Sequence, residues 1–294
     1  MSSWQGKSRG NKLGYRIFVW ILQNFGVLPA YLVLRIVVLY FFFFSYKASR
    51  VLYDFYRRRL GLNFLQTVGK IYRNYYQLGQ SIIDKVVVMA GIKNKFTFHF
   101  DGEDNLRSIA GMQRGGMLLS AHIGNWDIAG HLLKRLDTRI HIVIFDGEYQ
   151  QIKEYLDSIT GQRAVNLIVI RNDLSHIYAI NDAFKNNELV CMHADRFIEG
   201  NKTMTSTFCG DEARFPMGPF LLAAKFKVPV SFVFAVKEGN LHYHLFASKP
   251  RSYEHLEKGA VMQEMLNDFS AEMEHKVKRY PEQWFNYFNF WQQS

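Results

Sequence analysis

The sequence predicts an α/β fold with a largely parallel central sheet flanked by helices, preceded by an N-terminal helical segment that associates with a membrane. Three observations predict it. Beyond residue 93 short apolar runs alternate with helical patterns, polar residues cluster where two of these runs end, and the first 75 residues are both basic and strongly apolar. Alternating strands and helices are typical of α/β proteins, and 294 residues suffice for a large core.

Seven segments have the length and apolar character of strands and are bounded by turn residues. They are residues 96–100, 116–121, 140–145, 167–170, 189–193, 230–236 and 241–247. The chain divides most naturally after Lys93, where a run of helical segments ends. We therefore expect a helical, membrane-associating region over residues 1–93 and an α/β domain over residues 94–294.

The N-terminal apolar run covers residues 15–44 and contains only two charges, Arg16 and Arg35. Residues 26–44 are long enough to cross a bilayer, which takes about 20 apolar residues. Basic residues flank both ends of the run, so the positive-inside rule selects no orientation. This symmetry favours a helix lying in the membrane interface, or a hairpin, over a simple span. A buried core helix is the alternative.

The excess positive charge of the chain is concentrated in its N-terminal 75 residues. Residues 1–75 contain twelve Lys or Arg and one acid, whereas the whole chain has a net charge of +10. Basic residues beside an apolar run suit anionic lipid head groups, so we expect a membrane-surface partner and no nucleic acid. The two cysteines, Cys191 and Cys209, give no disulfide framework.

The most informative motif is Ser120-Ala-His-Ile-Gly-Asn-Trp-Asp127, at the junction of an apolar strand and a helix. Asn125 is a good N-cap for a helix that begins at Trp126, and Gly124 permits a tight turn before it. We expect His122 and Asp127 to meet, with His122 as general base and Asp127 as its carboxylate. Such a pair suits acyl transfer to a hydroxyl, because the imidazole accepts the proton of the attacking alcohol. The alternative is a structural role for both residues.

Two further clusters end apolar segments in polar residues. Asp195 and Arg196 follow the strand at 189–193 and should emerge at the same sheet edge as His122, and Arg214 precedes a turn that leads into a short helix at 220–226. With Asn125, these side chains are candidates for substrate binding. Cys191, His193 and Cys209 lack zinc spacing, His242 and His244 alternate along a strand face, and no glycine-rich nucleotide loop occurs. We expect no metal and no cofactor.

Taken together, several blocks resemble a known family. The His122-to-Asp127 motif, the Asp195-Arg196 pair, the block from Cys209 to Pro219 and the segment Pro281-Glu-Gln-Trp-Phe-Asn286 occur in the order found in the lipid A late acyltransferases. These enzymes are the lauroyl/myristoyl branch of the lysophospholipid acyltransferase superfamily. The resemblance covers nearly the whole chain, including its basic, apolar N-terminus.

The resemblance implies an enzyme at the cytoplasmic face of the bacterial inner membrane. It would move a fatty acyl chain from acyl carrier protein, or from acyl-CoA, to a hydroxyl of a membrane lipid, in the first place a lipid A precursor. His122 would be the base and Asp127 its orienting carboxylate, while Arg171, Asp195 and Arg196 fall where the family has polar residues around the active site.

Asp127 departs from many lipid A enzymes, which carry Glu there, whereas the wider glycerolipid superfamily has Asp. The acceptor therefore stays open, and a lysophospholipid or an aminolipid is the alternative within the enzyme class. A non-catalytic membrane-surface protein is the alternative from another class.

Overall fold

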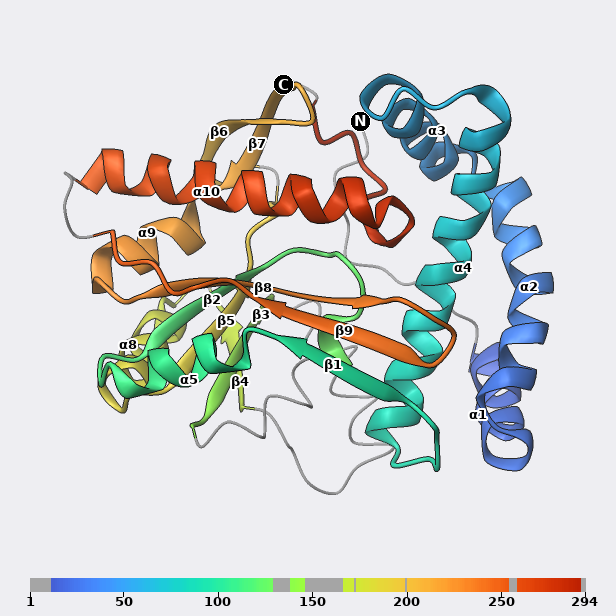
Figure 1. The fold of residues 1–294 in the computed structure, drawn as a ribbon, viewed down its shortest axis with the longest axis horizontal. Helices are drawn as coiled ribbons and strands as arrows, with labels where there is room; N and C mark the ends of the chain where they lie inside the picture. Colours follow the sequence, from blue (N-terminus) through green and yellow to red (C-terminus); the bar gives the residue numbers. More distant parts are fainter. Residues whose placement is uncertain are drawn as a thin grey trace.

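The computed structural model describes residues 12–128, 138–145, 166–171, 173–198, 200–253 and 258–291. Seven strands form one sheet in the order β1-β9-β8-β2-β5-β3-β4 (Figure 1). Their bounds are β1 Thr97–Asp101, β2 Gly116–Ser120, β3 Ile140–Phe145, β4 Asn166–Ile170, β5 Leu189–His193, β8 Val230–Lys237 and β9 His242–Ala247. Each of the seven strands predicted from the sequence is present, with ends that agree to within one residue, and the α/β fold class is confirmed.

The sheet is largely parallel, as expected, with one antiparallel pair formed by β8 and β9. β1 pairs with β9 alone among the described strands and forms one edge of the sheet. The central strand β2 is buried along its whole length. A parallel strand covered on both faces needs apolar residues at successive positions, which explains the continuous run Met117-Leu118-Leu119.

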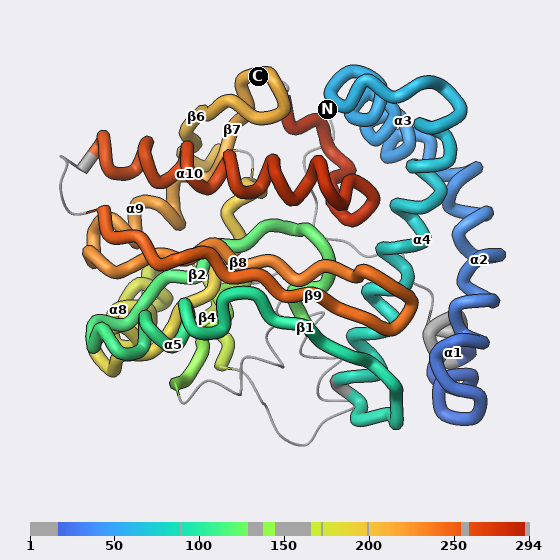
Figure 2. Tube along the Cα trace, in the orientation of Figure 1, coloured from blue at the N-terminus to red at the C-terminus, as the bar shows by residue number. Residues whose placement is uncertain are grey.

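Helices cover both faces of the sheet and one of its sides. Their bounds are α1 Lys12–Phe25, α2 Val27–Phe44, α3 Tyr46–Asp54, α4 Phe64–Met89, α5 Glu103–Gly111, α8 Ser175–Lys185, α9 Met217–Phe226 and α10 Lys258–Arg279, with short π and 3₁₀ turns at Phe55–Arg59 and Pro281–Gln283. In Figures 1 and 2, α10 runs along one face of the sheet, and α4 with α1 and α2 stands beside it.

One element was not predicted from the sequence. β6 Thr203–Phe208 and β7 Asp211–Pro216 form a separate antiparallel hairpin. Its turn is Cys209-Gly210, and both residues have positive φ, 50° and 89°. β6 consists mostly of Thr and Ser, so no apolar alternation marks it as a strand. The hairpin is anchored by the buried rings of Phe208 and Phe215, and Phe215 contacts Phe269 of α10.

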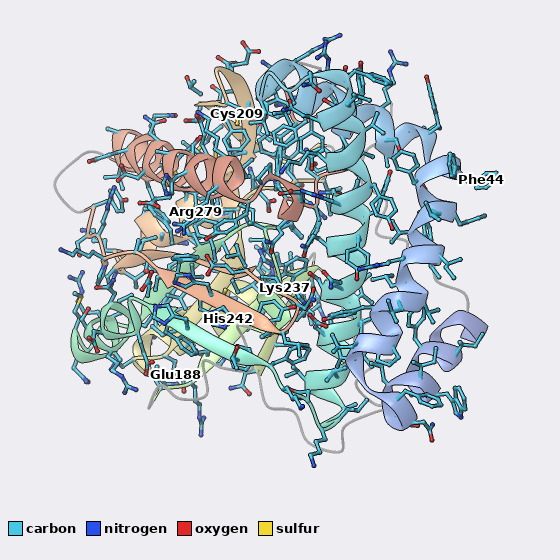
Figure 3. The ribbon with its side chains drawn as sticks, turned by 45° about the vertical axis from the view of Figure 1, so that its right-hand side comes forward. Phe44, Glu188, Cys209, Lys237, His242 and Arg279 are labelled. Atoms are coloured by element: carbon cyan, nitrogen blue, oxygen red, sulfur yellow. The ribbon has the colours of Figure 1, made fainter. Side chains whose placement is uncertain are left out.

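The N-terminal region forms a helical hairpin of α1 and α2 that bends at Gly26, whose φ is 83°. α2 packs on α4 through a buried stripe that includes Tyr31, Leu34 and Val38. The opposite side of α1 and α2 exposes large apolar side chains, and Phe44 points away from the domain in Figure 3. They are Ile17, Trp20, Phe25, Leu28, Leu32, Ile36, Leu39, Tyr40, Phe43 and Phe44. Among the described residues, α2 is the one helix long and apolar enough to cross a membrane.

A buried polar cluster joins α2 to the sheet. Lys237 of β8 donates hydrogen bonds to Asp84 of α4 and to Tyr31 of α2, and Asp84 also accepts from Tyr243 of β9. Figure 3 shows Lys237 between the sheet and α4. Removing one partner of such a cluster leaves a buried charge uncompensated. The main apolar core likewise contains residues from Ile21 to Phe290, on both sides of the expected boundary at residue 93.

Candidate active site

The turn that follows β2 presents His122. Two backbone amides of the turn are held from other elements: Gly124 donates to the carbonyl of Gln283 (2.8 Å) and Asn125 to that of Ala235 (2.7 Å). Gly124 has φ 68°, and a Cβ there would lie 1.9 Å from the Ala235 carbonyl oxygen. Only glycine fits this close approach. The carbonyl of His122 accepts from the amide of Phe285 (3.0 Å), so the C-terminal segment fixes the histidine's backbone.

The expected helix begins after this turn. Its first residue is Trp126, and the side-chain oxygen of Asn125 accepts a hydrogen bond from the amide of Ile128 (3.4 Å). This is the N-cap arrangement predicted for Asn125. The continuation of the helix past residue 128, through Leu132, Leu133 and Leu136, lies outside the described residues.

His122 is paired with Asp195. Nδ1 of His122 lies 2.7 Å from Oδ1 of Asp195, and the backbone amide of His122 donates to Oδ2 of the same carboxylate (2.9 Å). His122 is 6% exposed and Asp195 1% exposed. The strands β2 and β5 are parallel neighbours, with Ser120 opposite His193, so residues just beyond their carboxyl ends meet. Both oxygens of the carboxylate are thus used to fix one histidine.

This pairing corrects the expectation that Asp127 orients His122. Within the described residues, the carboxylate of Asp127 has one partner, Nζ of Lys85 on α4, at 2.9 Å. Asp127 lies in the first turn of the helix that follows the tight turn, and it faces α4 instead of the end of β2. Spacing along the chain had suggested the His122–Asp127 pair, and a contact between neighbouring strands provides the actual partner.

The buried charges of the site support an ionised Asp195 and a neutral His193. Burial opposes the charge of Asp195, but the ion pair and hydrogen bond with His122, aided by Arg196, hold its pKa below its usual range. Burial lowers the pKa of His193 well below its usual value, and the neighbouring His122 lowers it further. His193 therefore remains neutral near pH 7.

Three aromatic rings gather at the end of β2. The ring of His122 lies 4.4 Å from that of His193 and 4.9 Å from that of Trp126, measured between centroids. Nδ1 of His193 is buried without a hydrogen-bond partner. Because an unpaired N–H is costlier to bury than an unpaired lone pair on an imidazole, the proton of neutral His193 belongs on Nε2.

An apolar pocket begins at these rings. It has a volume of about 690 Å³ including its open mouth, and Trp126, His193 and Ser120 form one end of it. From there it crosses the sheet over β8 and β9 towards β1 and α5, where Leu106 and Ala247 line it. Its lining is mostly apolar, which suits an acyl chain.

The other predicted binding residues are placed differently. Asn125 is 2% exposed, and its amide donates to the Ser81 carbonyl and the Tyr243 hydroxyl. These contacts give Asn125 a role in holding the turn, and its role in substrate binding stays a prediction. Arg196 lies at the same sheet edge as His122, as expected. It donates to the carbonyl of Phe285, which secures the segment that holds His122.

The two remaining arginines lie on other elements. Arg171 is exposed at the end of β4, and β5 and β3 separate that strand from β2. Three strand spacings amount to about 14 Å, so Arg171 does not contact His122. Arg214 in β7 donates to Thr203 Oγ1 and stacks over the ring of Phe197, two residues after Asp195.

In the part of the chain that the structure describes, two groups of side chains bring three possible metal-binding atoms within 4.8 Å of one another: His122 with His193 and Asp195, and His99 with Asp101 and His244. In the first group Asp195 is already bound to His122 through both oxygens. The sequence had raised His193 only as a zinc ligand without suitable spacing, and it had not drawn attention to Lys85. A histidine at the last position of a strand adjacent to the motif strand is the signal that would have identified His193.

Comparisons with known proteins identify the family of the chain. The family model for the bacterial lipid A biosynthesis acyltransferases matches residues 70–293. No curated protein matches the chain significantly. Among solved structures, the chain is similar to the 1-acyl-sn-glycerophosphate (LPA) acyltransferase PlsC from Thermotoga maritima, at 13% identity and a TM-score of 0.39, over 83% of this chain and 97% of that one. The matched residues contain the His122 turn, β5 with Asp195 and the C-terminal segment that holds them. The chain belongs to the family of bacterial lipid A biosynthesis acyltransferases.

Proposed function

We propose that this acyltransferase moves a fatty acyl chain from acyl carrier protein to a hydroxyl of a membrane lipid, with His122 as general base. The primary candidate for the acceptor is a lipid A precursor. The observation that supports this most is the His122–Asp195 pair at 2.7 Å. The ring of His122 packs against Trp126 and His193, which line an apolar pocket. A base beside an apolar pocket can bring a hydroxyl and an acyl chain to one point. No nucleophile of the enzyme is needed.

In the proposed step, Nε2 of His122 accepts the proton of the acceptor hydroxyl as its oxygen attacks the thioester carbonyl. The tetrahedral intermediate then collapses: the C–S bond breaks, the new ester C–O bond remains, and the proton passes from His122 to the leaving thiolate. Asp195 accepts from Nδ1, which sets the tautomer that leaves Nε2 free. Its negative charge also stabilises the imidazolium that forms during the step.

His193 is suited to hold the developing oxyanion. It is neutral and lines the pocket, and its buried Nδ1 places its proton on Nε2. A neutral imidazole N–H donates a hydrogen bond without first protonating the substrate. We therefore assign the thioester carbonyl to His193, with the acyl chain running from it across the sheet.

The exposed apolar face of α1 and α2 supports a position at the membrane surface. Its large side chains would lie in lipid, while the buried stripe of α2 stays against α4. The basic flanks suit anionic head groups, which fits the cytoplasmic face of the inner membrane. The same basic surface would steer an acidic carrier protein by long-range attraction.

The experiment is a deletion of the gene in its native bacterium, followed by mass spectrometry of lipid A and of total lipids. We expect lipid A that lacks one acyl chain, restored by the wild-type gene and not by the His122→Ala gene. Unchanged lipid A with an accumulating lysophospholipid or aminolipid would move the acceptor to that lipid. Lipids unchanged in every class would contradict the proposal.

A further inference from the structure

A second histidine cluster lies away from the catalytic turn, on the paired strands β1 and β9. His99 of β1 stands opposite His244 of β9 in the register, and their ring centroids are 4.7 Å apart. Asp101, two residues after His99, shares its face of the sheet because side chains alternate along a strand. Asp101 and Phe246 also line the β1 end of the apolar pocket. The cluster therefore lies beside the β1 end of the pocket and shares no residue with the group of His122, His193 and Asp195.

The polar atoms of the cluster converge. Oδ2 of Asp101 lies 2.9 Å from Nε2 of His244, and Oδ1 lies 3.4 Å from Nε2 of His99. One atom from each residue lies within 4.8 Å of the others. In a tetrahedral zinc site, bonds of about 2.0–2.1 Å place the ligand atoms about 3.3 Å apart. Only small side-chain movements separate the three residues from that geometry.

His244 is oriented from behind by a carboxylate. Its Nδ1 lies 3.1 Å from Oε2 of Glu238. Glu238 in turn accepts from the hydroxyl of Tyr280 and is 3.7 Å from Arg279, and these contacts lower its pKa, the Tyr280 hydrogen bond most strongly. Metal-binding histidines commonly donate their second N–H to such a carboxylate.

His244 lies between two carboxylates, with its Nδ1 at Glu238 and its Nε2 at Asp101. A cation held by Nε2 and the Asp101 carboxylate would be attracted by both negative groups.

The surrounding charges favour a transition metal over calcium or magnesium. Asp101 and Glu238 face two cations of α10, Arg279 and Lys276. Nζ of Lys276 lies 3.4 Å from the ring centroid of Phe246. The local charge is therefore balanced, and only one ligand is an oxygen donor. Hard cations need several oxygens, whereas imidazole suits zinc, nickel and copper.

We propose that His99, Asp101 and His244 bind one divalent transition-metal ion, with zinc as the primary candidate. The bound ion would link the edge strand β1 to β9. The fourth position is open to solvent, since the side chains of His99 and Asp101 are 60% and 57% exposed. The role is structural: the ion crosslinks a strand that has one neighbour in the described sheet.

The test is a zinc titration of the tag-free, full-length protein in detergent after removal of metals, in competition with a chromophoric chelator. We expect one Zn²⁺ per chain and a higher melting temperature with zinc. His99→Ala should weaken binding at least tenfold, and Asp101→Asn should do the same. Both side chains are exposed, so the fold should tolerate either change. His242→Ala is the matched control, because His242 lies two residues from His244 on β9 and pairs with Thr97 (2.7 Å; labelled in Figure 3).

Three outcomes would overturn the proposal. They are no stoichiometric zinc binding by the wild type, equal binding by His99→Ala and wild type, or binding that survives His99→Ala and is lost in His122→Ala. The last result would place the ion on His122, His193 and Asp195 instead. None of these measurements depends on turnover, so the zinc site can fail while the proposed acyl transfer stands.

Discussion

Asp195 Oδ1 and His122 Nδ1 lie 2.7 Å apart although 73 positions separate the two residues in the chain. The contact exists because β2 and β5 are parallel neighbours whose carboxyl ends meet. The same carboxylate holds the backbone amide of His122 through its second oxygen. Asp195 therefore fixes both the position and the tautomer of the proposed base, and Asp127 is free to pair with Lys85.

The two aspartates should differ sharply when each is replaced by its amide. Asp195→Asn removes the charge that stabilises the imidazolium and allows the wrong tautomer, so we expect kcat to fall at least ~100-fold. Asp127→Asn weakens an ion pair with Lys85 that is about three-quarters buried and makes no contact with His122, so we expect less than a ~10-fold change in kcat. Steady-state kinetics with acyl carrier protein thioester measures both. A larger loss in Asp127→Asn than in Asp195→Asn would contradict the assignment.

His193 should make the protein less stable in mild acid. Its folded pKa lies below the unfolded value of 6.5, so at lower pH the unfolded state binds a proton that the folded state does not. This contribution is fully present above pH 6.5 and is lost as the pH falls below it. When the pH falls from 7.5 to 5.5, the unfolding free energy of His193→Leu should therefore decrease by about 1 kcal/mol less than that of the wild type.

Chemical unfolding in mild detergent at the two pH values measures that difference. His176→Leu provides the control, because His176 lies on α8, outside the site. Equal losses in the wild type and His193→Leu would show that His193 is not held neutral by burial.

The pocket predicts which acyl chains the enzyme accepts. Ala247→Leu adds three carbon atoms to the wall near the β1 end of the pocket, so the longest chains should be excluded first. Each excluded methylene is worth about 1–3 kcal/mol, and kcat/KM for long donors should fall about tenfold or more relative to short ones. Ala224→Leu, on α9 outside the pocket, is the control. An unchanged chain-length profile would place the acyl chain elsewhere.

The outer face of α2 predicts how the protein meets lipid. Leu32 and Ile36 are 60% and 71% exposed, and replacing both with Gln should weaken binding to anionic vesicles about tenfold or more, because each apolar side chain inserted in lipid contributes about 1.5–3 kcal/mol. Sedimentation with vesicles measures it. Tyr178→Gln, equally exposed on α8, should leave binding unchanged. Equal vesicle binding by the α2 double variant and the wild type would exclude this face as the membrane contact.

The strands of the sheet and the position of His122 follow from local patterns, so they could be predicted from the sequence. Apolar runs such as 116–120 carry their own signal, and Gly124 and Asn125 mark the turn and the helix start. The partner of His122 could not be predicted in this way, because strand order decides which carboxylate lies beside it. The β6–β7 hairpin was missed for a related reason: Thr203 to Thr207 have no apolar alternation, and the hairpin is anchored by the distant Phe269.

The most direct measurement is acyl transfer by the purified full-length protein, from a labelled acyl carrier protein thioester to a lipid A precursor in mixed micelles. We predict transfer by the wild type, and none above background by His122→Ala with an unchanged melting temperature. Transfer by His122→Ala at a rate near that of the wild type would contradict the role of His122 as the base.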